Sequence, residues 1–288
     1  MEHLVIGAGQ IGPHVVRQLL AAGQDVTVAT RSGHAPADLP ATSLDATDGA
    51  ALRRALVDVD ALHLCLHASA YRDDAWRREL PALEATVLAA AASTGTTVVF
   101  PESVYAFDAS TPISATSRIA PRSPLGEVRR DLLAQRTASD ARTVSVVAGD
   151  FVGPGVGQSH AGPRMWQPVL DGKTVRPVGD VDTVHAWTYL PDLAATMIAA
   201  ADGTEPLVVA PAVHATQREL VTAFAAAAGV AVPRINAVPL WAMRAVGAFH
   251  RETRTIAQTG YLFTEPLQLD STFPATPLDV VAKATITG

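Results

Sequence analysis

The stretch Leu4-Val5-Ile6-Gly7-Ala8-Gly9-Gln10-Ile11-Gly12 decides the fold of this chain. Its three leading apolar residues predict a short strand, and a helical pattern begins directly after the glycines. One face of that helix is apolar and holds Ile11, Val15, Val16, Leu19 and Leu20. A Gly-x-Gly-x-x-Gly turn between a strand and a helix is typical of a dinucleotide-binding site.

Each glycine of this turn has a separate role. Gly7 permits the tight turn, Gly9 lets a pyrophosphate approach the backbone, and Gly12 lets the helix pack close to the strand. The helix start offers N–H groups and the positive dipole end to phosphates, and Pro13 suits the first turn because its missing N–H is not needed there. We expect the cofactor to be held by Gly7, Gly9, Gln10, Ile11 and Gly12.

The composition is that of a globular protein. The chain has 288 residues, of which 48% are hydrophobic and 17% charged, enough for one large domain or two interleaved ones. The net charge of −6 disfavours nucleic acid as a partner, and the single cysteine excludes an intramolecular disulfide. No basic leader precedes the first strand, and the alanine-rich run 83–92 is too short to span a bilayer. We expect a cytoplasmic protein without a membrane partner.

The end of the second predicted strand, 24–29, indicates which dinucleotide binds. A site selective for NAD places an acidic residue here to bind the ribose 2′-hydroxyl. This chain has Thr30, Arg31 and Ser32 instead, and a guanidinium beside hydroxyls suits a 2′-phosphate. The alternative is that Arg31 is an ordinary solvated surface residue. We predict NADP(H) as the cofactor, with NAD(H) as the alternative.

A second cofactor segment follows the short strand expected at 42–44. Asp45 and Ala46 come next, at a place where an aspartate can face the adenine amino group. An aspartate in this segment can equally cap the helix expected over 49–57. The two roles are compatible, and both remain open.

The strand expected at 61–67 contains His63, Cys65 and His67 on one face. Histidine and cysteine are zinc ligands, but a central parallel strand is buried on both faces, which favours packing of His63 and Cys65 beneath a helix. We predict no metal. Because ligands bind at the carboxyl ends of such strands, we expect the nicotinamide–ribose pocket to be lined by Leu66, His67 and Ala68.

Strands alternate with helices six times in the first 150 residues, which predicts an α/β fold with a Rossmann-like, doubly wound parallel sheet. Beyond residue 150 the pattern loosens, although Thr216 and Glu219 form a capping box that predicts a helix ending near Gly229. The proline-bearing tail is expected to be mostly irregular up to a helix near Asp279.

Four segments resemble the extended or atypical short-chain dehydrogenases/reductases, of the kind described as NAD-dependent epimerases/dehydratases. They are the cofactor turn 7–12, Ser103-Val104-Tyr105, residues 150–155 and residues 187–194. The resemblance implies a Rossmann domain over 1–150, with later returns near 180–210, and a smaller, interleaved substrate-binding part over 151–288. It also implies a small-molecule substrate and a homodimer.

The family's catalytic signature is Tyr-x-x-x-Lys with a Ser upstream, and this chain departs from it. In the family the Tyr exchanges a proton with the substrate oxygen, while the Lys lowers the Tyr pKa and holds the nicotinamide ribose. The best-placed match runs over 123–129, with Leu125 at the Tyr position and Arg129 at the Lys position. Leucine cannot transfer a proton, and arginine keeps the charge but is hardly a base.

An enzyme with this sequence needs a substitute proton donor. Tyr105 is the first candidate, because it follows the fifth strand at the carboxyl edge of the sheet, and Glu102 and His67 come next. The place of the upstream Ser falls to either Glu102 or Ser103. The alternative for Tyr105 is an aromatic ring packed under the loop with a structural hydrogen bond. Arg129 keeps the positive charge of the missing Lys.

Two functions are compatible with the sequence. The first is an NADP-dependent oxidoreductase or epimerase/dehydratase-like enzyme that acts on a small carbonyl or hydroxyl compound by hydride transfer. The second is a non-catalytic NADP-binding sensor or regulatory protein. In the second part of the chain, four residues either contact a substrate or are structural: Arg164, Trp166, His185 and Trp187.

Overall fold

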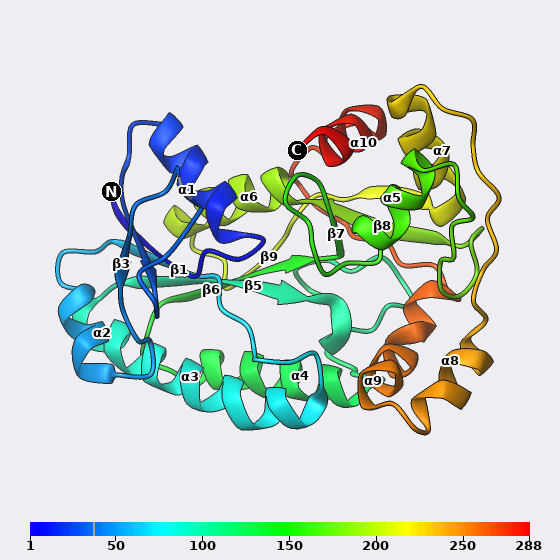
Figure 1. Ribbon diagram of the computed structural model, residues 1–288. Coiled ribbons are helices and arrows are strands. Elements are labelled where there is room, and N and C mark those ends of the chain that lie inside the picture. Colours follow the sequence, from blue (N-terminus) through cyan, green and yellow to red (C-terminus); the bar gives the residue numbers. More distant parts are fainter. Residues whose placement is uncertain (37) are drawn as a thin grey trace. The chain divides into compact units, whose positions relative to one another are not determined.

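The computed structural model describes residues 1–36 and 38–288 (Figure 1). Within these residues the larger sheet has seven strands in the order β3-β2-β1-β4-β5-β6-β9. Their bounds are β1 Glu2–Ile6, β2 Asp25–Thr30, β3 Ala41–Ser43, β4 Ala61–Leu64, β5 Thr97–Ser103, β6 Thr143–Ala148 and β9 Leu207–Val209. β1 pairs in parallel with β2 and β4, and β4 with β5, so the doubly wound parallel sheet is confirmed.

Helices cover both faces of this sheet. They are α1 Gly12–Ala21, α2 Gly49–Ala55, α3 Asp73–Thr94, α4 Pro124–Thr137 and α6 Leu190–Asp202. In Figure 1, α2, α3 and α4 lie below the sheet, and α1 and α6 lie above it. The central strand β4 is therefore buried along its whole length, as its apolar sequence requires.

The core on the α3 face joins that helix to the central strands. Val87 and Leu88 of α3 pack in one cluster with Leu62 of β4 and with Val98 and Phe100 of β5, all at most 4% exposed. Burying each such side chain contributes about 1.5–3 kcal/mol. This packing fixes the carboxyl ends of β4 and β5, where the candidate site residues lie.

The chain forms two compact units. Unit 1 contains residues 1–103, 127–147 and 193–208, and unit 2 contains residues 104–126, 148–192 and 209–288. The chain thus passes between the units more than once, as an interleaved architecture requires. The loop 104–126 belongs to unit 2, whereas the sequence analysis placed it in the first domain.

Unit 2 has a smaller sheet in the order β10-β8-β7, in which β8 is antiparallel to β10 and parallel to β7. Its elements are β7 Asp150–Val152, α5 Pro163–Leu170, β8 Val184–Tyr189, β10 Val213–Thr216, α7 Gln217–Ala228, α8 Leu240–Gly247, α9 Arg251–Thr259 and α10 Leu278–Thr287. The capping box is confirmed, because the side chains of Thr216 and Glu219 each accept from the other's backbone N–H. None of the described helices is long and apolar enough to cross a membrane.

The structure differs from the sequence prediction in three places. Leu20 is 51% exposed, since it lies at the edge of the apolar face of α1. β4 ends at Leu64, so residues 65–67 form the turn beyond the strand. Residues 251–263 are helical rather than irregular, and two of the buried positions of α9, Thr255 and Thr259, are polar.

Candidate dinucleotide site and active site

The glycine turn before α1 is closed on the sheet side and open on the other. Gly7 has a φ of +106°, and a Cβ there would lie 2.5 Å from the Cys65 carbonyl oxygen. A Cβ on Gly12 would lie 1.9 Å from the Gly7 carbonyl oxygen, so α1 starts directly against the turn. At Gly9, by contrast, a Cβ would meet no described atom within 4 Å. A pyrophosphate fits this open side.

The start of α1 suits an anion. Ile11 is the N-cap residue, its side chain makes no capping hydrogen bond, and the first turn contains no acidic residue. Pro13 occupies the first turn, as predicted. Gln10 is partly buried in the turn itself. The positive end of the helix dipole is therefore not neutralised by the first-turn side chains.

The turn after β2 holds Arg31 on the surface of unit 1. The Ser43 hydroxyl donates to the Arg31 carbonyl at 3.0 Å, and the Thr30 hydroxyl donates to the His34 carbonyl at 3.0 Å. These bonds fix the backbone, while the side chains of Arg31 and Ser32 stay exposed. Both side chains are free to contact a 2′-phosphate.

Of the two aspartates in this segment, Asp48 has the helix-capping role that the sequence allowed. Asp48 caps α2, accepting from two backbone N–H groups of the first turn at 2.9 and 3.0 Å. Asp45 accepts from the Thr47 hydroxyl at 2.7 Å and from its N–H at 2.9 Å. These bonds lower the pKa of Asp45, and the charge of Arg31 adds to the effect. Ala46, between the two carboxylates, is buried.

His67 lies in the turn beyond β4, between the partly buried Leu66 and Ala68. Its ring packs edge-on against Trp76 with centroids 4.6 Å apart, and its Nε2 lies 3.4 Å from Nη2 of Arg129. Although part of the side chain is exposed, desolvation of the ring and then the Arg129 charge lower the pKa of His67 to about 4. His67 is therefore neutral near pH 7 and able to accept a hydrogen bond.

His63 packs inside the sheet, which confirms the structural interpretation of this strand. Its Nε2 lies 3.2 Å from Nδ1 of His3, and burial lowers the pKa of His63 to about 3. Burial likewise raises the pKa of the Cys65 thiol to about 12. Among the described residues, no group of three or more His, Cys, Asp or Glu side chains could hold a metal ion.

A buried charge cluster connects α3, β5 and α4 in unit 1, and consists of Glu84, Glu102, Arg129 and Arg136. Arg136 donates to both Glu84 oxygens at 2.7 Å, and its Nη1 donates to Glu102 at 2.8 Å. The same Nη1 also donates to the Ser145 hydroxyl at 3.0 Å. Arg136 is thus paired through all three of its guanidinium nitrogens.

Arg129 is the member of the buried charge cluster with spare hydrogen-bonding capacity. Its side chain is 9% exposed, and its Nε lies 3.5 Å from Oε1 of Glu102. That Nε nevertheless has no hydrogen-bond partner among the described residues. The guanidinium stacks on the Trp76 ring at 4.7 Å. A buried donor without a hydrogen bond costs about 1–3 kcal/mol, so Arg129 is less fully satisfied than Arg136.

The remaining candidates near β5 lie on either side of the boundary between the units. Ser103 donates its N–H to Glu102 at 2.7 Å, with its hydroxyl 3.4 Å from the same oxygen. Tyr105 is half-buried in a short helix of unit 2, η1 Val104–Ala106. One residue, Val104, separates Ser103 from Tyr105, so their Cα atoms are at most about 7 Å apart. Leu125, at the family's Tyr position, is fully buried.

Sequence reasoning missed Trp76, Glu84 and Arg136. The signal for Glu84 was present in the sequence, since Glu84 stands among apolar positions of a helix that must pack on the sheet. A charge at such a position requires a buried partner of opposite sign. Trp76 carried no comparable signal, because an aromatic residue at the start of a helix is ordinarily part of a core.

The four candidates in unit 2 are mostly held from within that unit. His185 is buried, lies 2.8 Å from the Asp150 carboxylate and 2.9 Å from a backbone carbonyl of η2 (Gly260–Phe263). Trp187 donates its indole N–H to a backbone carbonyl of β10 at 2.9 Å. The indole N–H of Trp166 is buried without a partner among the described residues, and Arg164 is exposed.

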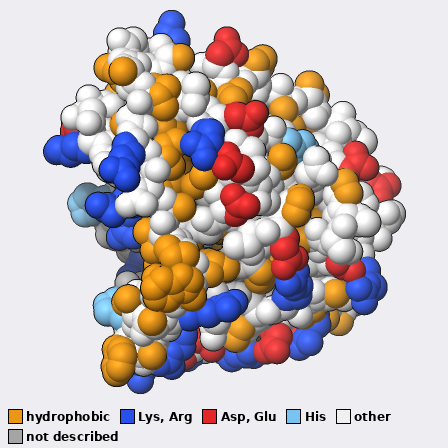
Figure 2. Space-filling view, turned by 90° about the vertical axis from the view of Figure 1, so that its right-hand side faces the viewer, with side chains coloured by type: hydrophobic (Ala, Val, Ile, Leu, Met, Phe, Trp, Pro, Cys, Tyr) orange, Lys and Arg blue, Asp and Glu red, His pale blue; other side chains and the backbone are white. Residues whose placement is uncertain are grey.

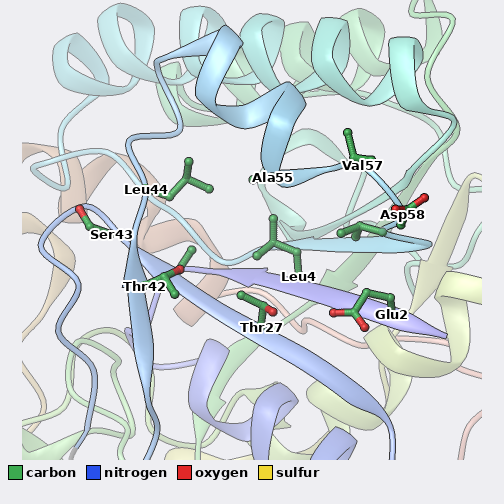
Figure 3. A pocket seen from close by; sticks show the side chains of 11 residues that line it. Glu2, Leu4, Thr27, Thr42, Ser43, Leu44, Ala55, Val57 and Asp58 are labelled. Atoms are coloured by element: carbon green, nitrogen blue, oxygen red, sulfur yellow. The ribbon is translucent and has the colours of Figure 1, made fainter.

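A hollow of about 420 Å³ lies in unit 1 beside β1, β2, β3 and α2 (Figure 3). Figure 3 shows Leu4, Thr27 and Thr42 along its strand side and Leu44 and Ala55 opposite them. None of the residues predicted to bind the cofactor lines it. Leu44, however, directly precedes Asp45, so the hollow adjoins the segment expected at the adenine.

The sequence model of the NAD dependent epimerase/dehydratase family matches residues 3–210. Among solved structures, the chain resembles a UDP-glucose 4-epimerase from Thermus thermophilus in complex with NAD, at 21% identity over 99% of this chain and 98% of that one, with a TM-score of 0.76. It also resembles a dTDP-glucose 4,6-dehydratase double mutant from Streptomyces venezuelae with NAD bound, at 20% identity over 99% and 96% of the two chains, with a TM-score of 0.74.

An L-threonine dehydrogenase from Cupriavidus necator is 17% identical over 99% of both chains, with a TM-score of 0.76. At these identities the solved structures establish the fold. No curated protein matches the chain. Because the family match covers most of the sequence, and because the turn at 7–12 fits a dinucleotide, the resemblance is confirmed: the chain belongs to the NAD dependent epimerase/dehydratase family, a family of enzymes.

Proposed function

We propose that this protein is an NADP-preferring oxidoreductase or epimerase/dehydratase-like enzyme that acts on a small carbonyl or hydroxyl compound. The observation that carries the proposal is the buried, unpartnered Nε of Arg129, at the position where the family pattern has the Lys that holds the nicotinamide ribose. A guanidinium that stayed unsatisfied without a function would be a net cost to folding. In this proposal the Arg129 guanidinium, whose Nε faces Glu102, holds the nicotinamide ribose with its outer nitrogens.

The proposed cofactor site lies in unit 1. Its phosphate end comprises Gly7, Gly9, Gln10, Ile11 and Gly12, its 2′-phosphate end Thr30, Arg31 and Ser32, its adenine end Asp45 and Ala46, and its nicotinamide–ribose end Leu66, His67, Ala68 and Arg129. The dinucleotide, when bound, accepts or supplies the hydride. The solved relatives carry NAD. The preference for NADP rests on the exposed Arg31 and on the absence of an acidic residue directly after β2.

Glu102 acts as a positioning residue in this proposal. Its carboxylate accepts from Arg136 and from the Ser103 N–H, and it lies against the Nε side of Arg129. With its oxygens occupied by donors, Glu102 orients Arg129 rather than transferring a proton. The proton at the substrate oxygen falls to the Tyr105 hydroxyl, with Ser103 as its hydrogen-bonding companion.

Replacing Tyr105 by Phe tests this assignment. Turnover of UDP-glucose, dTDP-glucose and L-threonine, the compounds named for similar structures, is followed by nucleotide reduction and product analysis with NADP and with NAD. For any compound that reacts, Tyr105→Phe should slow turnover about 100-fold or more, because it removes the proton donor. Tyr189→Phe serves as the control, since that ring packs against Gly153 in unit 2. Unchanged turnover in Tyr105→Phe removes Tyr105 from the mechanism.

A second function, an NADP-binding sensor without turnover, is favoured by one observation. Leu125 fills the family's Tyr position and is fully buried, so no proton donor can act from that site. A sensor should bind NADPH, as measured by thermal shift, yet form no product with any of the three compounds. Product formation by the unmodified chain would exclude it.

A further inference from the structure

A second hollow of about 420 Å³ lies within unit 2, between α8, α9 and the segment before α4. Three arginines line it, Arg122, Arg244 and Arg254, together with Gln258 and Tyr261. None of the described residues that line it is acidic. This concentration of positive charge stands out in a chain with a net charge of −6.

Close packing of two helices brings Arg244 and Arg254 to the same hollow. A Cβ on Gly247 would lie 2.8 Å from Cα of Arg254, so α8 and α9 touch at a point where only glycine fits. Arg254 donates its Nε to the Gly247 carbonyl and its Nη2 to the Ala248 carbonyl, both at 2.9 Å. Arg254 is thereby fixed at the end of α8, one turn beyond Arg244.

The three arginines differ in how their charge is balanced. Arg122 forms a two-pronged ion pair with Glu265 and stacks on the Tyr261 ring at 4.3 Å. Arg254 donates only to neutral carbonyls, and Arg244 is exposed without an ion pair among the described residues. Two positive charges in the hollow are therefore uncompensated, and both guanidiniums can receive an oxyanion.

Large apolar side chains stand exposed beside this hollow. Trp241, three residues before Arg244 and so on the same surface of α8, is 72% exposed, and Phe249 is 95% exposed. On the side of the molecule seen in Figure 2, hydrophobic side chains and Lys or Arg side chains lie directly beside one another in the lower part of the view. Aromatic surface next to paired guanidiniums suits a ligand with an apolar body and an anionic group.

We infer that unit 2 holds a binding site for a small organic anion, a phosphate ester or a carboxylate, with its oxygens on Arg244 and Arg254 and its apolar body against Trp241. All residues of this site belong to unit 2, and the inference does not depend on the proposed enzymatic function. Phosphate esters and carboxylates present the same oxyanion chemistry to a guanidinium, so two aromatic probes distinguish them.

Calorimetric titration of the full chain with phenyl phosphate, benzoate and inorganic phosphate tests the inference. One of the two aromatic probes should bind at least about fivefold more tightly than inorganic phosphate, because inorganic phosphate has no ring that can pack against Trp241. Arg244→Gln should weaken that probe about tenfold, the scale of one charge-assisted hydrogen bond. Trp241→Ala should lower the affinity for the aromatic probe and leave inorganic phosphate unchanged.

A matched control makes the result decisive. Arg234→Gln alters another exposed arginine of unit 2, outside the hollow, and should leave the affinity unchanged. The inference is overturned if no probe binds at millimolar concentration, or if Arg244→Gln and Arg234→Gln behave alike.

Discussion

Arg129 and Arg136 lie seven residues apart on α4, both are buried, and both contact Glu102. Arg136 places every guanidinium nitrogen on a partner: Glu84, Glu102 and the Ser145 hydroxyl. Arg129 has a buried Nε without a hydrogen bond and a long contact of 3.4 Å to a neutral His67. Two arginines of the same helix therefore differ: all guanidinium nitrogens of Arg136 have hydrogen-bond partners, whereas the Nε of Arg129 has none among the described residues.

This difference indicates that the two arginines of the buried charge cluster have different roles, one in folding and one in binding. A saturated buried ion pair holds the fold in register, and breaking it leaves charges without partners. An unsaturated buried cation lowers stability in the free protein and gains its missing partner when a ligand binds. Arg136 should therefore matter for folding, and Arg129 for binding. The predictions below separate the two.

Arg136→Met should give the largest effect. The substitution leaves the Glu84 carboxylate buried without its cation and leaves Glu102 with only its 3.5 Å contact to Arg129, so the free energy of unfolding should fall by about 3–5 kcal/mol. Urea denaturation followed by circular dichroism measures this. The double variant Glu84→Leu, Arg136→Met should recover part of the loss, because the carboxylate that lost its cation is removed. A loss below about 1 kcal/mol in Arg136→Met would contradict the structural role.

Arg129→Met should affect dinucleotide binding more than it affects stability. Stability should change by about 1 kcal/mol or less, since Arg129 has few well-formed bonds to lose, while the Kd for the dinucleotide should rise about 30-fold, equivalent to about 2 kcal/mol. Arg129→Lys, which restores the family's residue type, is the matched variant and should retain most of the affinity. If Arg129→Met unfolds the protein as readily as Arg136→Met does, the distinction between the two arginines fails.

Arg31 extends the comparison to an exposed arginine. Arg31→Ala should weaken NADPH by about 1–2 kcal/mol and leave NADH nearly unchanged, because only NADPH presents a 2′-phosphate to the guanidinium. Parallel binding curves for both cofactors measure the difference. Arg53→Ala on α2 controls for the general loss of positive charge from unit 1. Equal weakening of NADH by Arg31→Ala would remove the argument for NADP.

The parts of unit 1 that the sequence predicts correctly depend on short-range patterns. The turn at 7–12 and the cap at Asp48 in unit 1, like the capping box at Thr216 in unit 2, each place their interacting groups within a few residues of one another. The physical requirement, such as a position where a Cβ would collide, is then visible in the sequence itself.

The buried charge cluster could not be predicted in the same way. Arg136 meets Glu84 from 52 residues away and Glu102 from 34 residues away, so their pairing follows only once α3, β5 and α4 are packed. The sequence indicated that Arg129 stands at the family's Lys position. It gave no indication that the equally charged Arg136 would occupy the other carboxylate oxygen.

The smallest expected effect concerns pH at the unsaturated end of the cluster. Desolvation and the Arg129 charge lower the pKa of His67 to about 4, below its ordinary value of 6.5, so the ring is neutral throughout the range from about pH 5.5 to 8. His67→Gln keeps a neutral, hydrogen-bonding side chain at this position. The ratio of its dinucleotide Kd to that of the unmodified chain should therefore stay constant within about twofold over this range, and taking the ratio cancels any titration of the ligand itself. Calorimetric titrations at several pH values give that ratio. A ratio that changes across pH 6.5 would mean that His67 becomes charged beside Arg129, and the site would then carry two adjacent cations rather than one unsaturated one.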